Sequence, residues 1–125
     1  MIVGIGTDIV EVFRVRKAIK NEKFRERVYT EKERSYCEGR GAQAAASFAA
    51  RFSGKEAVLK AFGTGLSGGS LLDIEILPDE KGCPVVFLYG FYKELAEKRG
   101  ICKVHISLSH AQEYATAQCV MEGTE

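Results

Sequence analysis

The chain has 125 residues, of which 46% are hydrophobic and 28% are charged, and these values predict a single domain, residues 1–125, with a modest core. Its formal net charge of +1 argues against general nucleic-acid binding, because domains that bind nucleic acid are usually strongly basic. No apolar run approaches the roughly 20 residues that span a bilayer, so a membrane protein is not expected either.

Residues 2–9 predict a strand with two different faces. One face is mainly apolar, and the other carries Gly4, Gly6 and Asp8. A strand face made of glycines lets another backbone or a ligand approach closely. Asp8 is therefore a candidate site residue, although a tight strand crossing beside an incidental surface aspartate explains the pattern equally well.

Residues 11–20 predict an amphipathic helix, and a second helix should begin at Glu31, where Thr30 and Glu33 have capping-box spacing. The first helix has a narrow apolar stripe and an opposite side rich in cations. The stripe is formed by Val12, Val15 and Ile19, and the opposite side by Phe13, Arg16, Lys17 and Lys20. A basic face of this kind is usually only solvated, but an exposed Phe among cations favours a docking surface.

Residues 43–62 predict a long helix that ends at Gly63 and is followed by a glycine-rich loop. Glu56 and Lys60 flank one edge of its apolar sector, and Arg51 and Lys55 lie at the other edge. The first pair has the spacing of a simple helical ion pair, worth roughly 0.2–0.5 kcal/mol. A row of cations beside a glycine turn also suits a phosphate-rich ligand.

The second half of the chain predicts an antiparallel hairpin, a helix and two further strands. The hairpin strands cover residues 72–76 and 84–88, the helix covers 89–99, and the last strands cover 103–109 and 114–121. His110 stands in the turn between those strands, where it has a structural role or donates to phosphates. Helices first and antiparallel strands later indicate an α+β domain.

Two carboxylates can supply the protein part of a magnesium site. Mg²⁺ takes one or two carboxylates together with water and substrate phosphates. Asp8 and Glu56 meet that need if the first strand packs beside the long helix. The four cysteines have no C-x-x-C spacing, and the N-terminus has no signal-peptide pattern, so we expect a cytoplasmic protein with reduced thiols and no zinc.

Three blocks of the chain resemble holo-[acyl carrier protein] synthases, the bacterial 4′-phosphopantetheinyl transferases of fatty-acid synthesis. The blocks are GIGTDIVE at 4–11, RFSGKEAVLKAFGTG at 51–65 and SLSHAQEYA at 107–115. The family fold, an antiparallel sheet packed with a long central helix, is expected here. The family usually has alanines where this chain has Ser53 and Gly54, and this departure is not expected to touch a ligand.

The resemblance implies transfer of phosphopantetheine from coenzyme A to a serine of apo acyl carrier protein, with release of adenosine 3′,5′-bisphosphate and use of Mg²⁺. It also implies a homotrimer with active sites at the subunit interfaces. It assigns Asp8 and Glu56 to the metal, Arg51 and Lys60 to phosphates, Gly63 to the pyrophosphate region, His110 to the coenzyme A site, and Arg14 to carrier-protein docking.

The expected chemistry needs a base for the serine hydroxyl and a cation for the leaving phosphate. Glu56, directly or through a metal-bound water, is the first candidate for the base and His110 the second, and Lys60 is the candidate cation. For docking, the family match favours Arg14, and the helical pattern favours the face with Phe13, Lys17 and Lys20. A module that binds coenzyme A or a nucleotide without transfer, or an interaction domain, is the alternative function.

Overall fold

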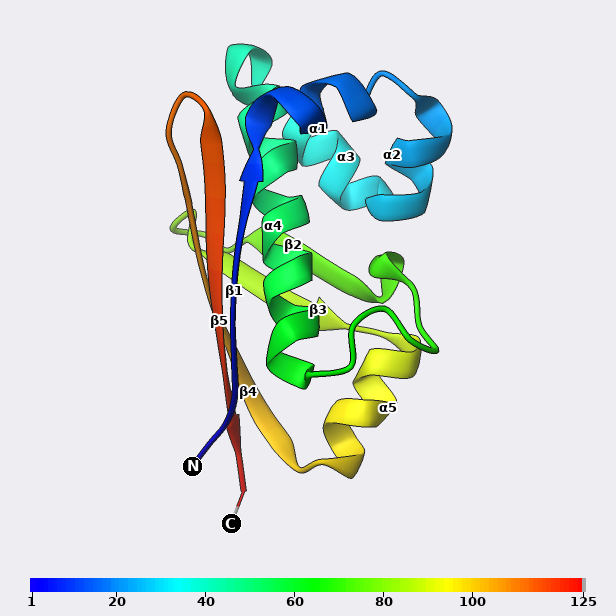
Figure 1. Cartoon of the computed structure of the whole chain (residues 1–125), viewed down its shortest axis with the longest axis vertical. Coiled ribbons are helices and arrows are strands. Elements are labelled where there is room, and N and C mark those ends of the chain that lie inside the picture. Colours follow the sequence, from blue (N-terminus) through cyan, green and yellow to red (C-terminus); the bar gives the residue numbers. More distant parts are fainter. Residues whose placement is uncertain (125) are drawn as a thin grey trace.

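The computed structural model describes residues 1–124 and places one long helix, α4, at the centre of the domain (Figure 1). The elements are β1 (Ile2–Glu11), α1 (Val12–Ala18), α2 (Glu22–Val28), α3 (Glu31–Glu38), α4 (Ala44–Phe62), β2 (Ile74–Pro78), β3 (Pro84–Leu88), α5 (Gly90–Lys98), β4 (Ile101–His110) and β5 (Tyr114–Gly123). Helices α1–α3 surround one end of α4, and α5 lies near the other end.

The strands form two antiparallel sheets. The larger sheet has the order β1-β5-β4, and the smaller one is the β2-β3 hairpin. Figure 1 shows the larger sheet nearly edge-on, with α4 against one face and no helix against the other. The predicted α+β architecture, with an antiparallel sheet packed on a long central helix, is confirmed. Within residues 1–124, no helix has both the length and the apolar character needed to cross a membrane.

The backbones of β1 and α4 lie so close together that a side chain would not fit between them at Gly4 and Gly6. A Cβ atom on Gly4 would lie 2.2 Å from the carbonyl oxygen of Ala61, and one on Gly6 would lie 2.0 Å from that of Ala57. Both positions therefore require glycine, and the prediction that another backbone approaches the glycine face is confirmed. Asp8, the next residue on that face, is held against the helix as a consequence.

Helix α4 is buried on most of its circumference, and this corrects the expectation for Lys55. Its side chain is fully buried, its Nζ lies 2.7 Å from Glu33 Oε1, and it donates to the carbonyl oxygens of Val28 (2.6 Å) and Leu71 (2.9 Å). Burial lowers the pKa of Lys55, and the charge of Glu33 opposes that shift. Lys55 thus forms a buried ion pair that connects α4 to α3, and its side chain is not available to a phosphate.

The other carboxylate oxygen of Glu33 connects the ion pair to the small sheet by a hydrogen bond. Glu33 Oε2 accepts from the backbone N–H of Ile76 at 2.8 Å, while Oε1 accepts from that of Thr30 at 2.9 Å. The predicted capping box at the start of α3 is confirmed by the reciprocal bond from Glu33 N–H to the Thr30 hydroxyl. One buried ion pair therefore connects α3, α4 and β2.

Some element boundaries and one exposure differ from the expectations. Helix α2 was not foreseen, and the Asn21 side chain caps it by accepting from two backbone amides. The strand expected from residue 72 begins at Ile74, after a 3₁₀ turn at Leu71–Asp73. Glu75, expected on the open side of that strand, is buried and accepts from the Thr30 and Tyr89 hydroxyls.

The Gly6→Ala substitution tests the close contact of β1 with α4. The added methyl group would meet a backbone oxygen that cannot move alone, so we expect unfolding to become easier by about 3 kcal/mol, the upper end of the usual overpacking cost. Gly39→Ala is the control, because Gly39 has φ −73° and its new Cβ would lie 3.4 Å from the backbone oxygen of Ser35, an ordinary contact distance. Equal stability of both variants in urea would contradict the contact.

Candidate active site

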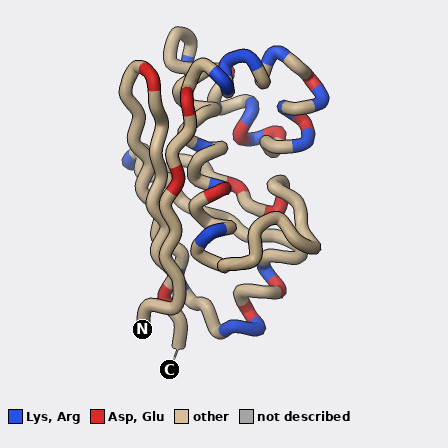
Figure 2. The backbone as a smooth tube through the Cα atoms, viewed as in Figure 1, with Lys and Arg blue, Asp and Glu red and all other residues tan. Residues whose placement is uncertain are grey.

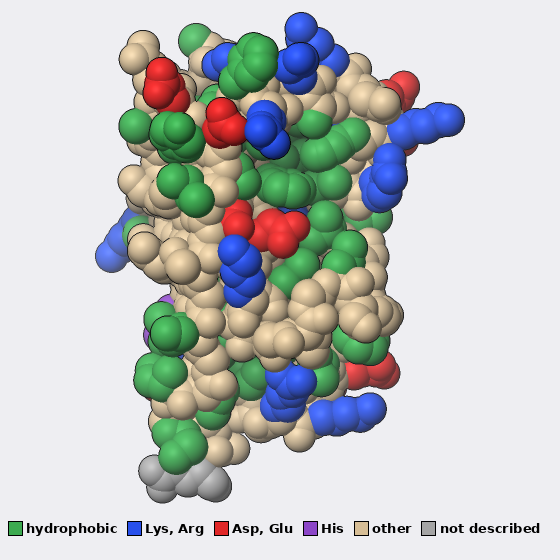
Figure 3. All heavy atoms as spheres, viewed as in Figure 1, with side chains coloured by type: hydrophobic (Ala, Val, Ile, Leu, Met, Phe, Trp, Pro, Cys, Tyr) green, Lys and Arg blue, Asp and Glu red, His purple; other side chains and the backbone are tan. Residues whose placement is uncertain are grey.

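A charged cluster forms where β1 crosses the face of α4 that carries Ser53, Glu56 and Lys60. These residues are three and four apart, a spacing that places them on one side of a helix. Lys60 Nζ lies 3.0 Å from Asp8 Oδ1, and the Ser53 hydroxyl donates to Asp8 Oδ2 at 3.0 Å. Lys60 also donates to the backbone oxygen of Thr7 at 3.1 Å. Figure 3 shows acidic and basic side chains side by side near the middle of this face.

Glu56 is the electrostatically strained member of the cluster. Burial raises its pKa above the usual value, the charge of Asp8 raises it further, and the charge of Lys60 opposes both effects. The two carboxylates therefore repel each other at a partly buried position, where water screens them incompletely. A cation placed between them would remove this repulsion.

The donor set fits magnesium better than a metal held by protein ligands alone. Residues 1–124 contain no group of three or more His, Cys, Asp and Glu side chains that could hold a metal ion. Mg²⁺ is commonly bound through one or two carboxylates and completes its shell with water and substrate phosphates. Asp8 and Glu56 supply that incomplete set, so the site would require a phosphate-bearing substrate.

The C-terminus of α4 adjoins the cluster and is adapted to an anion in two ways. Gly63 caps the helix with φ +78°, and a Cβ at this position would meet no atom within 4 Å, so there is open space beside it. Arg99 donates to the carbonyl oxygen of Phe62 at 2.6 Å. A guanidinium group at this end offsets the negative pole of the helix, which by itself would repel phosphates.

His110 and Arg51 do not join the cluster within one chain. His110 is the exposed last residue of β4 and borders a hollow with Gln43 and Ala46, at the start of α4. Ten residues of helix separate Ala46 from Glu56, which is roughly 15 Å. Arg51 and Lys60 are nine residues apart, half a turn out of phase, so they point to opposite sides of α4.

Arg51 is buried beneath α3, with only 7% of its surface exposed. Its guanidinium carbon lies 4.7 Å from the centre of the Tyr36 ring, and its Nε has no hydrogen-bond partner within the described part of the chain. A buried donor without a partner costs free energy. A phosphate contact by Arg51 would satisfy such a donor, and it stays a prediction.

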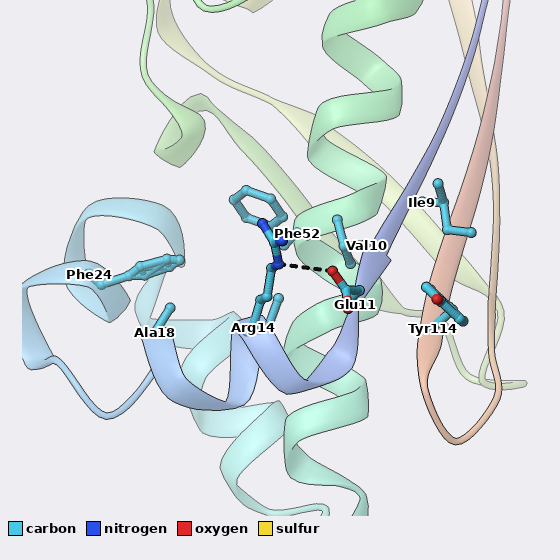
Figure 4. Close-up of a pocket in the computed structure, with 9 residues that line it drawn as sticks. Ile9, Val10, Glu11, Arg14, Ala18, Phe24, Phe52 and Tyr114 are labelled. Carbon is cyan, nitrogen blue, oxygen red and sulfur yellow. Dashed lines mark ion pairs between the residues drawn. The ribbon is translucent and has the colours of Figure 1, made fainter.

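A groove of about 590 Å³ opens beside the cluster, between α1, α2 and β1 (Figure 4). Its lining is mainly apolar, with one ion pair, Arg14 Nε to Glu11 Oε1 at 2.9 Å. The lining residues are Ile9, Val10, Glu11, Arg14, Val15, Ala18, Phe24, Phe52 and Tyr114. Phe24 and Phe52 are not among the site residues predicted from the sequence, and no helix is predicted at α2.

A family model described as the 4′-phosphopantetheinyl transferase superfamily matches residues 4–119. The chain belongs to this superfamily. It is 48% identical over 120 residues to a holo-[acyl-carrier-protein] synthase of Ruminiclostridium cellulolyticum, covering 94% of this chain and 90% of that protein.

Two solved structures of holo-[acyl-carrier-protein] synthases share the fold. The Bacillus anthracis protein, in complex with CoA (3′,5′-ADP), has a TM-score of 0.83 and 40% identity, with 99% of each chain covered. The Neisseria meningitidis protein has a TM-score of 0.89 and 35% identity, with 98% of this chain and 99% of that one covered. The resemblance seen in the sequence is therefore confirmed over nearly the whole phosphopantetheinyl transferase domain.

The departure at Ser53 and Gly54 is not expected to touch a ligand, but in the structure Ser53 contacts Asp8, a predicted metal ligand. The Ser53 hydroxyl binds Asp8 directly. The glycine at position 54 is explained by packing. A Cβ there would lie 2.5 Å from Ile76 Cδ1 and 3.0 Å from Leu108 Cδ2. At Gly54 the side chains of two strands occupy the space that an alanine methyl would need.

The Glu56→Gln substitution tests the strain in the cluster. Because its pKa is raised on folding, ionised Glu56 destabilises the folded protein relative to the unfolded one. This destabilisation is complete above the pKa of the folded protein and absent below the pKa of the unfolded protein, near 4.5. We therefore expect the variant to unfold at higher urea concentration than the native protein at pH 7, with the difference vanishing below about pH 4.5. Glu97→Gln, on exposed α5, controls for charge loss; a Glu56 variant less stable at pH 7 would contradict the strain.

Proposed function

We propose that this protein transfers 4′-phosphopantetheine from coenzyme A to a serine of apo acyl carrier protein and releases adenosine 3′,5′-bisphosphate. The observation that carries the proposal is the meeting of Asp8, Glu56 and Lys60 beside the open helix end at Gly63. Family membership over residues 4–119 supports it. The expected setting is fatty-acid synthesis in the cytoplasm.

In the proposed reaction, Asp8 and Glu56 are the residues that would hold Mg²⁺ beside the bound coenzyme A. When bound, the ion would neutralise negative charge on the phosphates and help to orient them for attack. Lys60 has a side chain that is 55% exposed, so it is free to turn from Asp8 toward the leaving phosphate. Its positive charge would stabilise the negative charge that develops there.

Proton transfer completes the proposed step. The serine oxygen forms a bond to the phosphorus that carries pantetheine, the bond from that phosphorus to the oxygen of adenosine 3′,5′-bisphosphate breaks, and the serine proton goes to Glu56. Glu56 is the proposed base because its carboxylate lies on the same face of α4 as Lys60, the residue proposed to stabilise the leaving phosphate. His110 of the same chain lies too far away to take this proton.

We further propose that the complete site lies between subunits of a homotrimer. We propose that His110 and Lys60, which lie at different ends of α4 in one chain, reach the same coenzyme A molecule because different copies supply them. The face of the large sheet away from α4 offers a surface for assembly, since Ile5 is 71% exposed and Ile9 is 61% exposed. Apolar patches of this kind mark protein interfaces, and three copies would close by cyclic symmetry.

The carrier protein is proposed to dock at α1, beside the groove. Phe13 is 59% exposed, and Lys17 Nζ lies 5.1 Å from the centre of its ring. Figure 2 shows basic residues recurring along α1, the side expected to face an acidic carrier protein. Arg14 lies at the mouth of the groove. The groove is also lined by Val10 of β1, which is two residues after Asp8. This position favours Arg14 as the contact nearest the reacting serine, with Phe13, Lys17 and Lys20 further along the surface.

The decisive experiment for the proposed function is mass spectrometry of apo acyl carrier protein after incubation with the protein, coenzyme A and Mg²⁺. We expect the carrier protein to gain the mass of phosphopantetheine. Asp8→Ala and Glu56→Ala should abolish that gain in proteins that remain folded by circular dichroism. This check matters for Asp8, whose side chain is only 12% exposed and contacts both Ser53 and Lys60. EDTA should stop the reaction until Mn²⁺ is added.

Coenzyme A bound without any mass gain would instead identify a binding module. A Glu56→Ala variant with native turnover would remove Glu56 from both the metal site and the proton transfer.

Charge reversal at α1 tests the docking surface. Arg14→Glu, or Lys17→Glu combined with Lys20→Glu, should raise the KM for carrier protein by roughly tenfold through like-charge repulsion and leave the KM for coenzyme A nearly unchanged. Transfer by the native protein should weaken as salt rises above roughly 0.15 M, where the Debye length is about 8 Å. Lys98→Glu, on α5, is the control; native KM and salt dependence in the α1 variants would exclude this surface.

A further inference from the structure

Ser53 makes a contact that serine residues inside helices rarely make. Its side chain is fully buried in the middle of α4. A serine there usually directs its hydroxyl to the carbonyl oxygen one turn earlier in its own helix. Ser53 instead donates to Asp8 Oδ2 on β1, at 3.0 Å. The hydroxyl thus links the helix to the strand at one of the charged side chains of the cluster.

The two oxygens of Asp8 are held by residues of different exposure. Ser53, which is buried, binds Oδ2, while Lys60, whose side chain is 55% exposed, binds Oδ1. In the proposed reaction Lys60 turns toward the phosphate, and Oδ1 then becomes free for a cation. Ser53 is the contact that would remain, and it would keep the carboxylate plane fixed while Lys60 moves.

Glu56 lies three residues after Ser53, on the same side of α4. The Ser53 bond therefore sets the orientation of the Asp8 carboxylate relative to Glu56, the second proposed ligand. A site with only two protein carboxylates depends strongly on their mutual orientation, because magnesium requires near-ideal octahedral geometry.

We propose that Ser53 is a positioning residue that orients Asp8 for a divalent cation, an inference that rests on the proposed metal-dependent transfer. Hydrogen-bond partners of metal ligands typically change metal affinity by 10–100-fold when they are removed. A purely structural role for Ser53 would change the stability of the protein and leave its metal affinity unaltered.

The test is a Mn²⁺ titration followed by electron paramagnetic resonance, in the presence of coenzyme A and without carrier protein. We expect Ser53→Ala to raise the dissociation constant for Mn²⁺ roughly tenfold, and Ser53→Thr, which keeps the hydroxyl, to bind more tightly than the alanine variant. Ser47→Ala is the matched control, because it removes another buried hydroxyl from α4, and it should leave the constant within about twofold of the native value.

A kinetic measurement separates positioning from structural damage. The Mg²⁺ concentration for half-maximal transfer should rise roughly tenfold in Ser53→Ala, and kcat at saturating Mg²⁺ should return to near the native value. A native Mn²⁺ constant in Ser53→Ala, while Asp8→Asn loses Mn²⁺, would overturn the role of Ser53 and leave the metal site intact. If the native protein and Asp8→Asn bind Mn²⁺ equally, the proposed metal site itself fails, and the role of Ser53 fails with it.

Discussion

The direct contact between the backbones of β1 and α4 is the constraint on which the rest of the site depends. Gly4 and Gly6 leave no side chain between the strand and the carbonyl oxygens of Ala61 and Ala57. Because the strand lies so close, the short side chain of Asp8 reaches α4, where Ser53 and Lys60 hold it. A wider spacing would separate the strand carboxylate from its helical partners. The glycines therefore matter for chemistry as well as for packing.

The opposite side of α4 holds the helix in place within the domain. Lys55 and Glu33 form a fully buried ion pair there, and their remaining hydrogen-bonding capacity is used by backbone groups of three other segments. Removing one partner of such a pair typically costs 3–5 kcal/mol, because the other charge stays buried without compensation. This pair fixes α4 against α3 and β2, so the face that carries Glu56 and Lys60 is presented on a rigid helix.

The sequence predicts the order and type of most elements, and it predicts Asp8 and Glu56 as a pair, because glycine spacing and helical spacing are local signals. It places Lys55 and Lys60 at opposite edges of the apolar sector of the helix, but it does not show which of the two is buried. Both are lysines on one helix, and only the position of α3 decides that the first is enclosed and the second reaches solvent. The bond from Ser53 to Asp8 joins residues 45 positions apart, and no local pattern reports such a contact. Helix α2 begins after a cap at Asn21, a local signal on which none of the predictions from the sequence draws.

We propose that one chain supplies only part of each active site. Asp8, Glu56 and Lys60 lie where β1 crosses α4, while His110 ends β4 and borders a hollow with Gln43 and Ala46, at the start of α4. The exposed apolar face of the large sheet provides the surface on which copies could assemble, with the carboxylates of one chain near the histidine of the next.

The most direct test is transfer activity in co-expressed mixtures of two inactive variants, Asp8→Ala and His110→Ala. If the sites lie between subunits, some interfaces of a mixed trimer combine an intact Asp8 with an intact His110 of the neighbouring copy. Random 1:1 assembly then restores about a quarter of the sites. Mixtures that are as inactive as each variant alone, in trimers shown by mass to contain both chains, would contradict the claim.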